Sequence, residues 1–267
     1  MKLDRPIARG RTADIYPLGN DQIIKLYHDW MTDDAIRHEA AVARAVYAAG
    51  LPVPAAGDVI DVDGRRGLLY ERVQGPTMLA ALQARPWTFS QRARQLARLQ
   101  AAIHDHTPGA DFPDQRRRLE DKIRQAAGLS REQRASTLDA LATMPAGERL
   151  CHGDFHPDNV ILAKQEPVII DWIDATCGNP LADVARTSII LLGEAHKTSN
   201  PWYQRVLLKQ YHRRYLRAYF RLQPGGLTEY RAWRPIVAAA RMNEGIEALQ
   251  RWLAAQVALQ AKANVAP

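Results

Sequence analysis

One short stretch of the chain, His152-Gly-Asp-Phe-His-Pro-Asp-Asn159, carries residues whose types and spacing could do chemistry. It places a carboxylate, Asp154, five residues before an amide, Asn159. A second carboxylate, Asp171, follows twelve residues later, at the end of an apolar run over 167–170. One carboxylate can accept the proton of a substrate hydroxyl, while an amide oxygen and a second carboxylate can hold Mg²⁺ on nucleotide phosphates. This order predicts phosphoryl transfer, with Asp154 as the base and Asn159 and Asp171 as the metal ligands.

The stretch resembles the catalytic loop of the aminoglycoside phosphotransferase and choline kinase group, which are small-molecule kinases with a protein-kinase-like fold. The spacing from Asp154 to Asn159 equals that of the kinase loop, and Gly153 stands where protein kinases carry Arg. The resemblance runs from about residue 10 to about residue 186 and is most specific over 154–183. It implies a transferase that uses ATP, or GTP, with Mg²⁺. The acceptor would be a hydroxyl group of a small molecule, either an antibiotic-like compound or a metabolite.

The resemblance also implies supporting residues around this loop. His152 would pack and hydrogen-bond beneath the loop, and Asp183 would hold the loop's backbone. Neither residue is expected to touch the reacting atoms. Asp174, three residues after Asp171, has two open interpretations: a second metal contact, or a carboxylate that caps a turn.

An alternative use of the same stretch is zinc-dependent hydrolysis. Alternate residues could share one face of an extended segment and ligate zinc. Their order is not a standard one for zinc ligands, and the sequence offers no other obvious zinc-ligand cluster. We therefore favour phosphoryl transfer for the set His152, Asp154, His156 and Asp158.

The N-terminal part supplies residues that the resemblance places on the nucleotide phosphates. Lys25 lies on the third predicted strand and resembles the kinase lysine that contacts the α and β phosphates. Glu39, on the following helix, would pair with it. The three-glycine loop of protein kinases is reduced here to Gly10. Backbone N–H groups over 11–13 and the Thr12 hydroxyl could still meet a phosphate.

The segment 68–75 resembles the hinge that joins the two lobes of a kinase. Backbone groups near Glu71 and Val73 would bind the adenine edge, and Tyr70 would lie next to the base. These three assignments rest on the resemblance and not on a pattern in the sequence.

Hydrophobic periodicity predicts an α+β chain. The first seventy residues alternate like short strands around one helix, and beyond Gly75-Pro76 nearly every pattern is helical. With the resemblance, this gives a two-lobed protein-kinase-like fold: a small β-rich nucleotide-binding lobe over 1–73 and a larger, mainly helical lobe over 74–267. The second lobe would hold the catalytic loop, the metal site and the acceptor site. Two short strands are expected within 7–16, around a turn at Gly10-Arg11. The other expected strands are 22–27, 59–62, 66–73, 149–151, 160–162 and 168–170, and the main expected helices run from a cap at Thr32 to about 49 and over 78–84, 90–106, 116–129, 131–143 and 202–220.

The acceptor is expected to be small. Only eleven residues separate Asp171 from Asp183, and they lack the Ala-Pro-Glu stretch of a protein-kinase activation segment. That leaves little room for docking a peptide. The acceptor would bind helices after Pro180 and helices between Thr107 and Arg149. Arg and aromatic residues outnumber carboxylates in the C-terminal helices, which disfavours a polycation and favours an anionic, sugar-like or aromatic acceptor.

Composition is ordinary for a globular protein, with 46% hydrophobic and 24% charged residues. The first residues lack the apolar segment of a secretory signal, and no apolar run approaches the roughly 20 residues needed to cross a bilayer. We therefore expect a cytoplasmic protein with no membrane partner. Cys151 and Cys177 show neither disulfide nor zinc spacing and are expected to be reduced. The sequence does not indicate an oligomeric state.

The net charge of +7 is concentrated near the C-terminus. Residues 201–267 carry eleven Lys or Arg against three Glu. Such a segment could attract nucleic acid, but basic residues of this kind more often form the solvated face of amphipathic helices. We expect the latter, and no specific nucleic-acid partner.

The main alternative to an enzyme is a catalytically silent, nucleotide-binding scaffold on the same fold. The short phosphate loop around Gly10 keeps this alternative open. The intact set of candidate functional residues argues against it and favours an active small-molecule kinase: Lys25, Asp154, Asn159 and Asp171.

Overall fold

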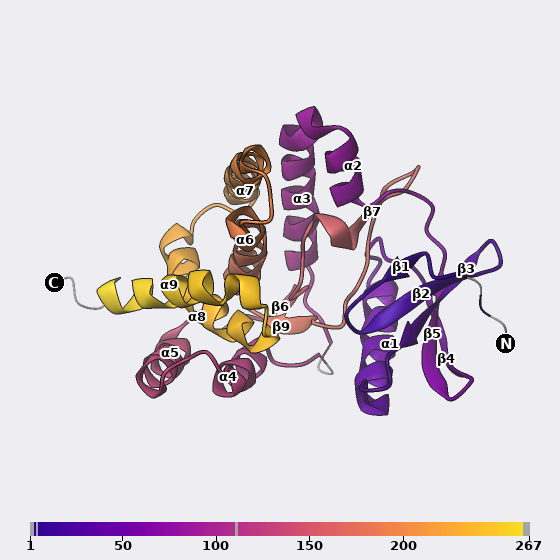
Figure 1. The fold of residues 1–267 in the computed structure, drawn as a ribbon, viewed down its shortest axis with the longest axis horizontal. Helices are drawn as coiled ribbons and strands as arrows, with labels where there is room; N and C mark the ends of the chain where they lie inside the picture. The colour runs from indigo at the N-terminus through magenta and orange to yellow at the C-terminus, as the bar shows by residue number, and fades with distance from the viewer. Residues whose placement is uncertain (1–2, 4, 110–111, 264–267) are drawn as a thin grey trace. The chain divides into compact units, whose positions relative to one another are not determined.

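The described residues of the computed structural model form an α+β fold (Figure 1). The outer ends of the two expected lobes lie outside the described residues, at 1–2 and 4 and at 264–267. The described part of the chain is residue 3 and residues 5–109 and 112–263.

Two compact units make up the chain, and neither is one continuous piece. The first unit joins Met1–Gln83 to Pro157–Asp174, and the second joins Ala84–His156 to Ala175–Pro267. The segment with the proposed metal ligands thus belongs with the N-terminal strands, and Asp154 belongs with the helices. The lobe boundary expected after residue 73 stays a prediction.

A five-stranded antiparallel sheet is the centre of the first unit. Its strands in chain order are β1 (Ala8–Arg9), β2 (Ala13–Leu18), β3 (Gln22–Tyr27), β4 (Ala56–Val62) and β5 (Arg65–Glu71). They are arranged β1-β2-β3-β5-β4, so β3 is central, and its Lys25 pairs with Ile15 on one side and Leu68 on the other. Asp63 and Gly64 turn the β4–β5 hairpin with φ of 52° and 84°, the left-handed values that a tight two-residue turn needs.

One helix, α1 (Asp33–Ala48), follows β3, and its apolar face packs against the sheet. Ile36 and Ala40 of this helix join Tyr27 and Leu68 of the strands in one buried cluster. The predicted cap is present, because the Thr32 side chain accepts a hydrogen bond from Ala35 N (3.2 Å). A capped first turn fixes where α1 begins, and α1 carries Glu39.

Replacing Thr32 with Ala should lower the free energy of unfolding by about 1 kcal/mol, because the first turn loses its side-chain acceptor. Thermal or urea unfolding measures the effect. The matched control is Thr228→Ala, at an exposed position in the first turn of another helix. Equal stability of the two variants would show that the Thr32 cap contributes nothing.

The segment 157–174 forms a hairpin that belongs to the first unit. Its strands are β7 (Val160–Leu162) and β8 (Pro167–Ile169), preceded by the short helix η2 (Pro157–Asn159). Ile169 N donates to Pro52 O (2.7 Å), which ties the hairpin to the N-terminal chain. Gly75 passes so close that a Cβ there would lie 2.5 Å from Leu162 O. Only glycine fits this crossing, which comes just before α2 (Met78–Ala84).

The second unit is mainly helical. α3 packs along α7, and α6 packs against both α7 and α8 (Figure 1). A short antiparallel pair, β6 with β9, precedes α6; β6 was predicted, whereas β9 was not. The elements are η1 (Pro86–Thr88), α3 (Phe89–His104), α4 (Gln115–Gln125), α5 (Arg131–Thr143), β6 (Arg149–Cys151), β9 (Thr176–Gly178), α6 (Pro180–His196), α7 (Trp202–Leu222), α8 (Leu227–Arg241), η3 (Met242–Glu244) and α9 (Glu247–Ala263).

The buried face of α7 differs in part from the face expected from the sequence. Tyr211, Tyr215 and Tyr219 are buried at four-residue spacing and form one stripe. The amphipathic pattern over 202–220 also predicts that Val206 is available for the core, together with Leu207, Tyr211, Tyr215 and Phe220. In the structure Val206 is 50% exposed. At about 100° per residue, Val206 lies on nearly the opposite side of the helix from Tyr215. The core-facing stripe of α7 therefore does not reach Val206 near the N-terminal end of the helix.

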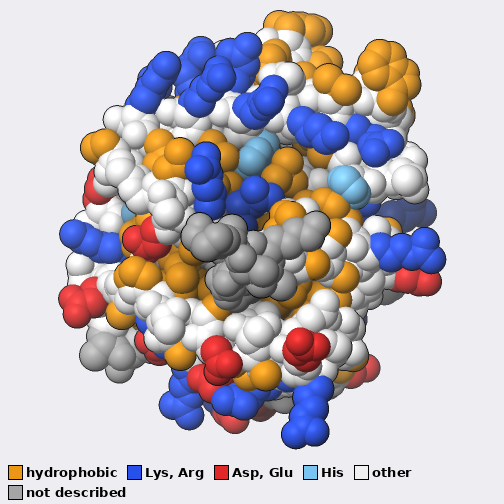
Figure 2. Space-filling view, turned by 90° about the vertical axis from the view of Figure 1, so that its left-hand side faces the viewer, with side chains coloured by type: hydrophobic (Ala, Val, Ile, Leu, Met, Phe, Trp, Pro, Cys, Tyr) orange, Lys and Arg blue, Asp and Glu red, His pale blue; other side chains and the backbone are white. Residues whose placement is uncertain are grey.

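Basic residues line the outer side of α7. The helix carries six Lys or Arg and no acidic residue, and five of the six side chains are exposed. Figure 2 shows Lys and Arg side chains gathered along the upper edge of one face of the molecule. This agrees with a solvated helix face. Throughout the described part of the chain, none of the helices combines the length and apolar character that crossing a membrane requires.

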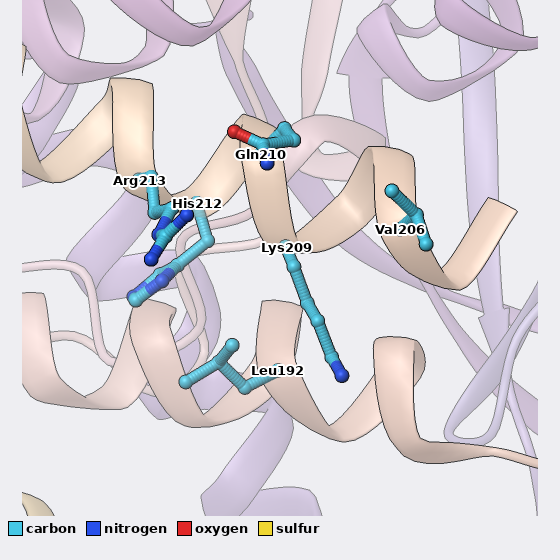
Figure 3. Close-up of a pocket in the computed structure, with 6 residues that line it drawn as sticks. All are labelled: Leu192, Val206, Lys209, Gln210, His212 and Arg213. Atoms are coloured by element: carbon cyan, nitrogen blue, oxygen red, sulfur yellow. The ribbon is translucent and has the colours of Figure 1, made fainter. Parts of the chain in front are cut away.

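A shallow cavity of about 360 Å³ lies beside α6 and α7 (Figure 3). His212 is buried there, and burial together with the charges of Arg234 and Arg213 lowers its pKa to about 4, so it is neutral at pH 7. The candidate catalytic residues do not line this cavity. Its lining is Leu192, Val206, Lys209, Gln210, His212 and Arg213.

Candidate active site

Lys25 is the centre of the candidate site in the first unit. Its side chain is buried, and Nζ donates to Glu39 Oε1 (2.6 Å) and to Asp171 Oδ1 (2.8 Å). Burial by itself disfavours the charged ammonium, but the two carboxylates outweigh it and hold the pKa of Lys25 above its usual range. Three separate segments, β3, α1 and the residues after β8, therefore converge on one fixed cation.

Glu39 is held in place from a second side. It is 1% exposed, and the Tyr70 hydroxyl donates to its Oε1 (3.3 Å). Tyr70, which the resemblance placed beside the adenine, thus also braces the partner of Lys25. Burial, followed by the charge of Glu39, raises the pKa of Tyr70 well above its usual value, so its hydroxyl keeps its proton.

Asn159 and Asp171 lie at the same end of the β7–β8 hairpin. Val160 pairs with Ile169, and Ile170 N donates to the backbone carbonyl of Asn159 (3.0 Å), which sets Asp171 one residue beyond this pair. Asp171 has a φ of 65°, a left-handed conformation that few side chains tolerate and that often marks functional positions. In this conformation the Asp171 carboxylate accepts a hydrogen bond from Lys25 (2.8 Å).

These donors fit magnesium by their chemistry. A carboxylate and an amide offer hard oxygen atoms, and Mg²⁺ usually takes only one or two protein ligands beside water and phosphate oxygens. Within residues 3, 5–109 and 112–263, no group of three or more His, Cys, Asp or Glu side chains is arranged to hold a metal. The four alternating residues considered as zinc ligands form no such group.

The remaining predicted nucleotide contacts lie on turns and strand ends. In the β1–β2 turn, Gly10 N donates to Ala13 O (2.9 Å), and Thr12 follows with a half-buried side chain. At the end of β5, Glu71 N donates to Ala55 O (2.9 Å), so this N–H is used within the unit. Val73, half-buried, comes two residues after β5.

In the second unit, Asp154 lies on the loop that follows β6. Gly153 has a φ of 79°, which turns the chain sharply before it. His152 is fully buried, its Nδ1 accepts a hydrogen bond from Asp154 N (3.2 Å), and its ring lies 5.5 Å from the Phe155 ring. Thr187 Oγ1 donates to Phe155 O (2.9 Å). The loop is thus fixed from beneath by buried groups.

Asp183 holds the same loop through its backbone. This carboxylate is 1% exposed and accepts hydrogen bonds from Gly153 N (2.7 Å) and His152 N (3.3 Å). Asn179 caps α6 by accepting from Leu181 N (2.9 Å), which places Asp183 in the first turn of the helix. These are the contacts that the resemblance implied, while their effect on activity remains a prediction.

Two buried residues of α3 complete the surroundings of Asp183, and the sequence did not single them out. Gln100 Nε2 donates to Asp183 Oδ2 (2.9 Å), and His104 Nε2 lies 3.0 Å from the same oxygen. Burial alone would raise the pKa of Asp183, but the bond from His104 and the bond from Gln100 hold it below the usual value. The available signal was two polar residues, four apart, on an otherwise apolar helix face.

Arg186 is the direct partner of the proposed base. Its Nη2 donates to Asp154 Oδ1 (2.9 Å), and its Nε donates to Gly153 O (3.0 Å). His156 Nε2 lies 3.4 Å from the other oxygen of Asp154. Burial would raise the pKa of Asp154, but the bond to His156 and the charge of Arg186 outweigh it, so the pKa lies well below its usual range. Asp154 is therefore ionised at neutral pH and suited to orienting a hydroxyl more than to strong basicity.

Replacing Arg186 with Gln should shift the acid limb of the activity profile to higher pH, because the pKa of Asp154 then rises toward its ordinary value. If Asp154 is the base, as predicted, its ionised form would be the active one, so wild-type activity should persist to lower pH than that of the variant. The pH dependence of kcat, measured with KM at each pH, checks this. An unchanged profile with an unchanged kcat would show that Arg186 does not act on Asp154.

The fold and the two groups of residues define a protein-kinase-like phosphotransferase class. The profile of the phosphotransferase enzyme family (APH) matches residues 5–236. The chain therefore belongs to this family. A comparison with curated protein sequences gave no match.

Solved structures of the same fold cover nearly the whole chain. One is a thermostable mutant of aminoglycoside phosphotransferase APH(4)-Ia with AMP-PNP and hygromycin B, at 17% identity and a TM-score of 0.67, covering 98% of this chain and 94% of the other. A choline/ethanolamine kinase family protein from Mesorhizobium loti has 16% identity and a TM-score of 0.59, with coverages of 100% and 89%. Macrolide 2'-phosphotransferase MphH from Brachybacterium faecium has 17% identity and a TM-score of 0.55, with coverages of 99% and 94%. At these identities the likeness shows the protein-kinase-like fold alone.

Proposed function

We propose that this protein transfers the γ-phosphoryl group of ATP to a hydroxyl of a small molecule. The observation that carries the proposal is the buried Lys25, held 2.6 Å from Glu39 and 2.8 Å from Asp171. A charged lysine on strand β3, paired with a glutamate of the following helix, is the arrangement that kinases use to contact nucleotide phosphates. A purely structural ion pair would not need a third partner in a left-handed backbone conformation.

The first unit supplies the groups that bind the nucleotide. Lys25 contacts the phosphates, and backbone groups near Gly10 with the Thr12 hydroxyl cover them. Val73 and the carbonyl of Glu71 take the adenine edge. Asn159 and Asp171 hold Mg²⁺, which when bound neutralises charge on the phosphates. Related structures contain AMP-PNP or ADP, which supports a nucleotide as donor.

The second unit supplies the proton acceptor. Asp154 takes a hydrogen bond from the acceptor hydroxyl, orients its oxygen toward the γ-phosphorus and receives the proton as the new P–O bond forms. The bond between the γ-phosphorus and the bridging oxygen breaks, and that oxygen leaves with ADP. Arg186 and the backbone bonds of the loop keep the carboxylate ionised and aimed. Because the transition state of phosphoryl transfer is loose, positioning contributes more here than basicity.

Two observations support the proposed acceptor class: the short segment between Asp171 and Asp183, and the ligands of related structures. The eleven residues between Asp171 and Asp183 include β9 and the start of α6, which leaves little length for a segment that docks a peptide. Solved structures of the same fold are named for hygromycin B, gentamicin, choline and a macrolide as ligands or substrates. A small hydroxylated molecule is therefore the acceptor proposed for this chain.

An acceptor screen tests the function. Purified protein is incubated with Mg²⁺ and ATP, or GTP, and ADP or GDP release is measured over a panel of hydroxylated antibiotics, sugars and amino alcohols. The proposed enzyme releases ADP or GDP above the acceptor-free rate with at least one compound, and mass spectrometry shows a phosphoryl group added to that compound. Tight nucleotide binding without transfer to any acceptor would favour a silent scaffold.

A further inference from the structure

The ionic contacts of Asp154 continue past Arg186 to a second arginine. Arg186 Nη1 lies 2.5 Å from Glu244 Oε1, and Arg241 Nη1 lies 3.8 Å from Glu244 Oε2. Arg241 ends α8 and Glu244 ends η3, so the turn between these two helices brings both side chains to α6. The result is a row of alternating charges that starts at the proposed base: Asp154, Arg186, Glu244 and Arg241.

Arg241 is buried but its donors are poorly used. Its side chain is 7% exposed, and neither Nε nor Nη1 has a hydrogen-bond partner among the described residues. The contact with Glu244, at 3.8 Å, is too long for a hydrogen bond. Arg186 differs, because its three nitrogens contact Asp154, Gly153 and Glu244.

The charges around Arg241 leave it cationic. Burial and then the nearby charge of Arg186 lower its pKa to about 10, so it still carries its proton at pH 7. The other charged groups that act on it are the carboxylates of Glu244, Asp154 and Glu194. All three also pair with another cation, since Glu244 and Asp154 pair with Arg186, and Glu194 pairs with Lys197 at 2.6 Å.

A buried guanidinium with unmet N–H groups is an unusual feature. Buried polar groups in proteins are nearly always hydrogen-bonded, and a charged donor gains most from a charged oxygen acceptor. The same position would repel an ammonium group. The unpaired donors of Arg241 therefore suit a negatively charged partner that offers oxygen acceptors.

We propose that Arg241 binds an oxyanion, a carboxylate or a phosphate, carried by the acceptor, so that the enzyme selects anionic alcohols. This inference rests on the proposed function and names the acceptor class of the same site. Arg186 aims the base, Glu244 spaces the two arginines, and Arg241 holds the anionic end of the acceptor while its hydroxyl meets Asp154.

Four compounds that share a vicinal diol and differ in the group attached to it, which is anionic, neutral or cationic, test the proposal: glycerate, glycerol 3-phosphate, glycerol and 3-amino-1,2-propanediol. Calorimetric titration without nucleotide should give affinities at least about tenfold higher for the two anions than for glycerol, and the amine should bind most weakly. Arg241→Met should remove this preference. Arg241→Lys keeps the charge and should retain part of it. Arg231→Met, at an exposed arginine of the same helix, should behave like the wild type.

Several outcomes would overturn the proposal. One is an equal affinity for all four diols, which includes no binding of any of them. Another is an unchanged preference for the anionic diols in Arg241→Met. A fall in ATP affinity in Arg241→Met without any diol preference would assign the oxyanion to the transferred phosphoryl group, which also overturns it. Thermal stabilisation of the wild type by Mg²⁺ and ATP, without diols, is read separately. If Mg²⁺ and ATP do not stabilise the wild type, the proposed function is contradicted, whereas the acceptor class is tested only by the diol titrations.

Discussion

Replacing Asp154 with Asn should lower kcat by about 10²- to 10⁴-fold, because the amide cannot receive the proton of the acceptor hydroxyl. The shape of the side chain is kept, and its remaining oxygen can still accept from Arg186, whose Nη2 now lies 2.9 Å from Oδ1. Nucleotide affinity should change little, since the proposed phosphate and metal ligands lie in the first unit. Steady-state rates with the acceptor found by screening, together with nucleotide titration, measure both.

The control for this substitution is Asp139→Asn, at an exposed carboxylate on α5 in the same unit. It should keep the wild-type kcat. Wild-type kcat in Asp154→Asn would contradict the role of Asp154. A loss of nucleotide binding in that variant would indicate instead that Asp154 acts on the nucleotide.

Replacing Asp183 with Ala should lower the free energy of unfolding by about 3–5 kcal/mol, because it removes a fully buried charged acceptor and leaves its donors unpaired. The donors are two loop N–H groups and the side chains of Gln100 and His104. Activity should fall as well, since Gly153 and the base beside it lose their anchor. Urea unfolding and kcat measure the two effects, with Asp139→Ala as the exposed control.

The pKa of Asp183 adds a pH dependence to this prediction. The folded-state pKa lies below the unfolded value, so the carboxylate stabilises the fold fully above about pH 4 and loses that contribution as pH falls further. Asp154, whose pKa is also lowered, should add to the same loss. Wild-type stability should therefore drop more steeply below pH 4 than that of the Asp183→Ala variant. Parallel curves would contradict the lowered pKa.

Much of the candidate site could be predicted because it lies in local patterns. Lys25 and Glu39 fall on consecutive elements whose types the alternation and the Thr32 cap indicate, and the structure joins them at 2.6 Å. The spacing from Asp154 to Asn159 is a local motif as well. Asp171 could be predicted as a candidate ligand from its place at the end of the apolar run over 167–170, but its contact with Lys25, which spans 146 residues of sequence, could not.

The rest depends on how distant helices meet. Glu244 reaches Arg186 only because η3 turns the chain after α8, and no periodicity in the sequence encodes that turn. The strand β9 is three residues long and shows no alternation, so its pairing with β6 comes from tertiary contact alone. Val206 was misplaced for the opposite reason: its apolar character suggested burial where the helix faces solvent.

Thermal unfolding with ATP, with and without Mg²⁺, tests the central claim of a metal-nucleotide site most directly. At a ligand concentration of about 100 times Kd, the wild type should gain roughly 2.7 kcal/mol of stability, and the gain should require Mg²⁺. Asp171→Ala should lose most of the Mg²⁺-dependent part, whereas Asp58→Ala, at an exposed carboxylate of the same unit, should keep it. No stabilisation of the folded wild type by ATP or GTP under either condition would contradict the account.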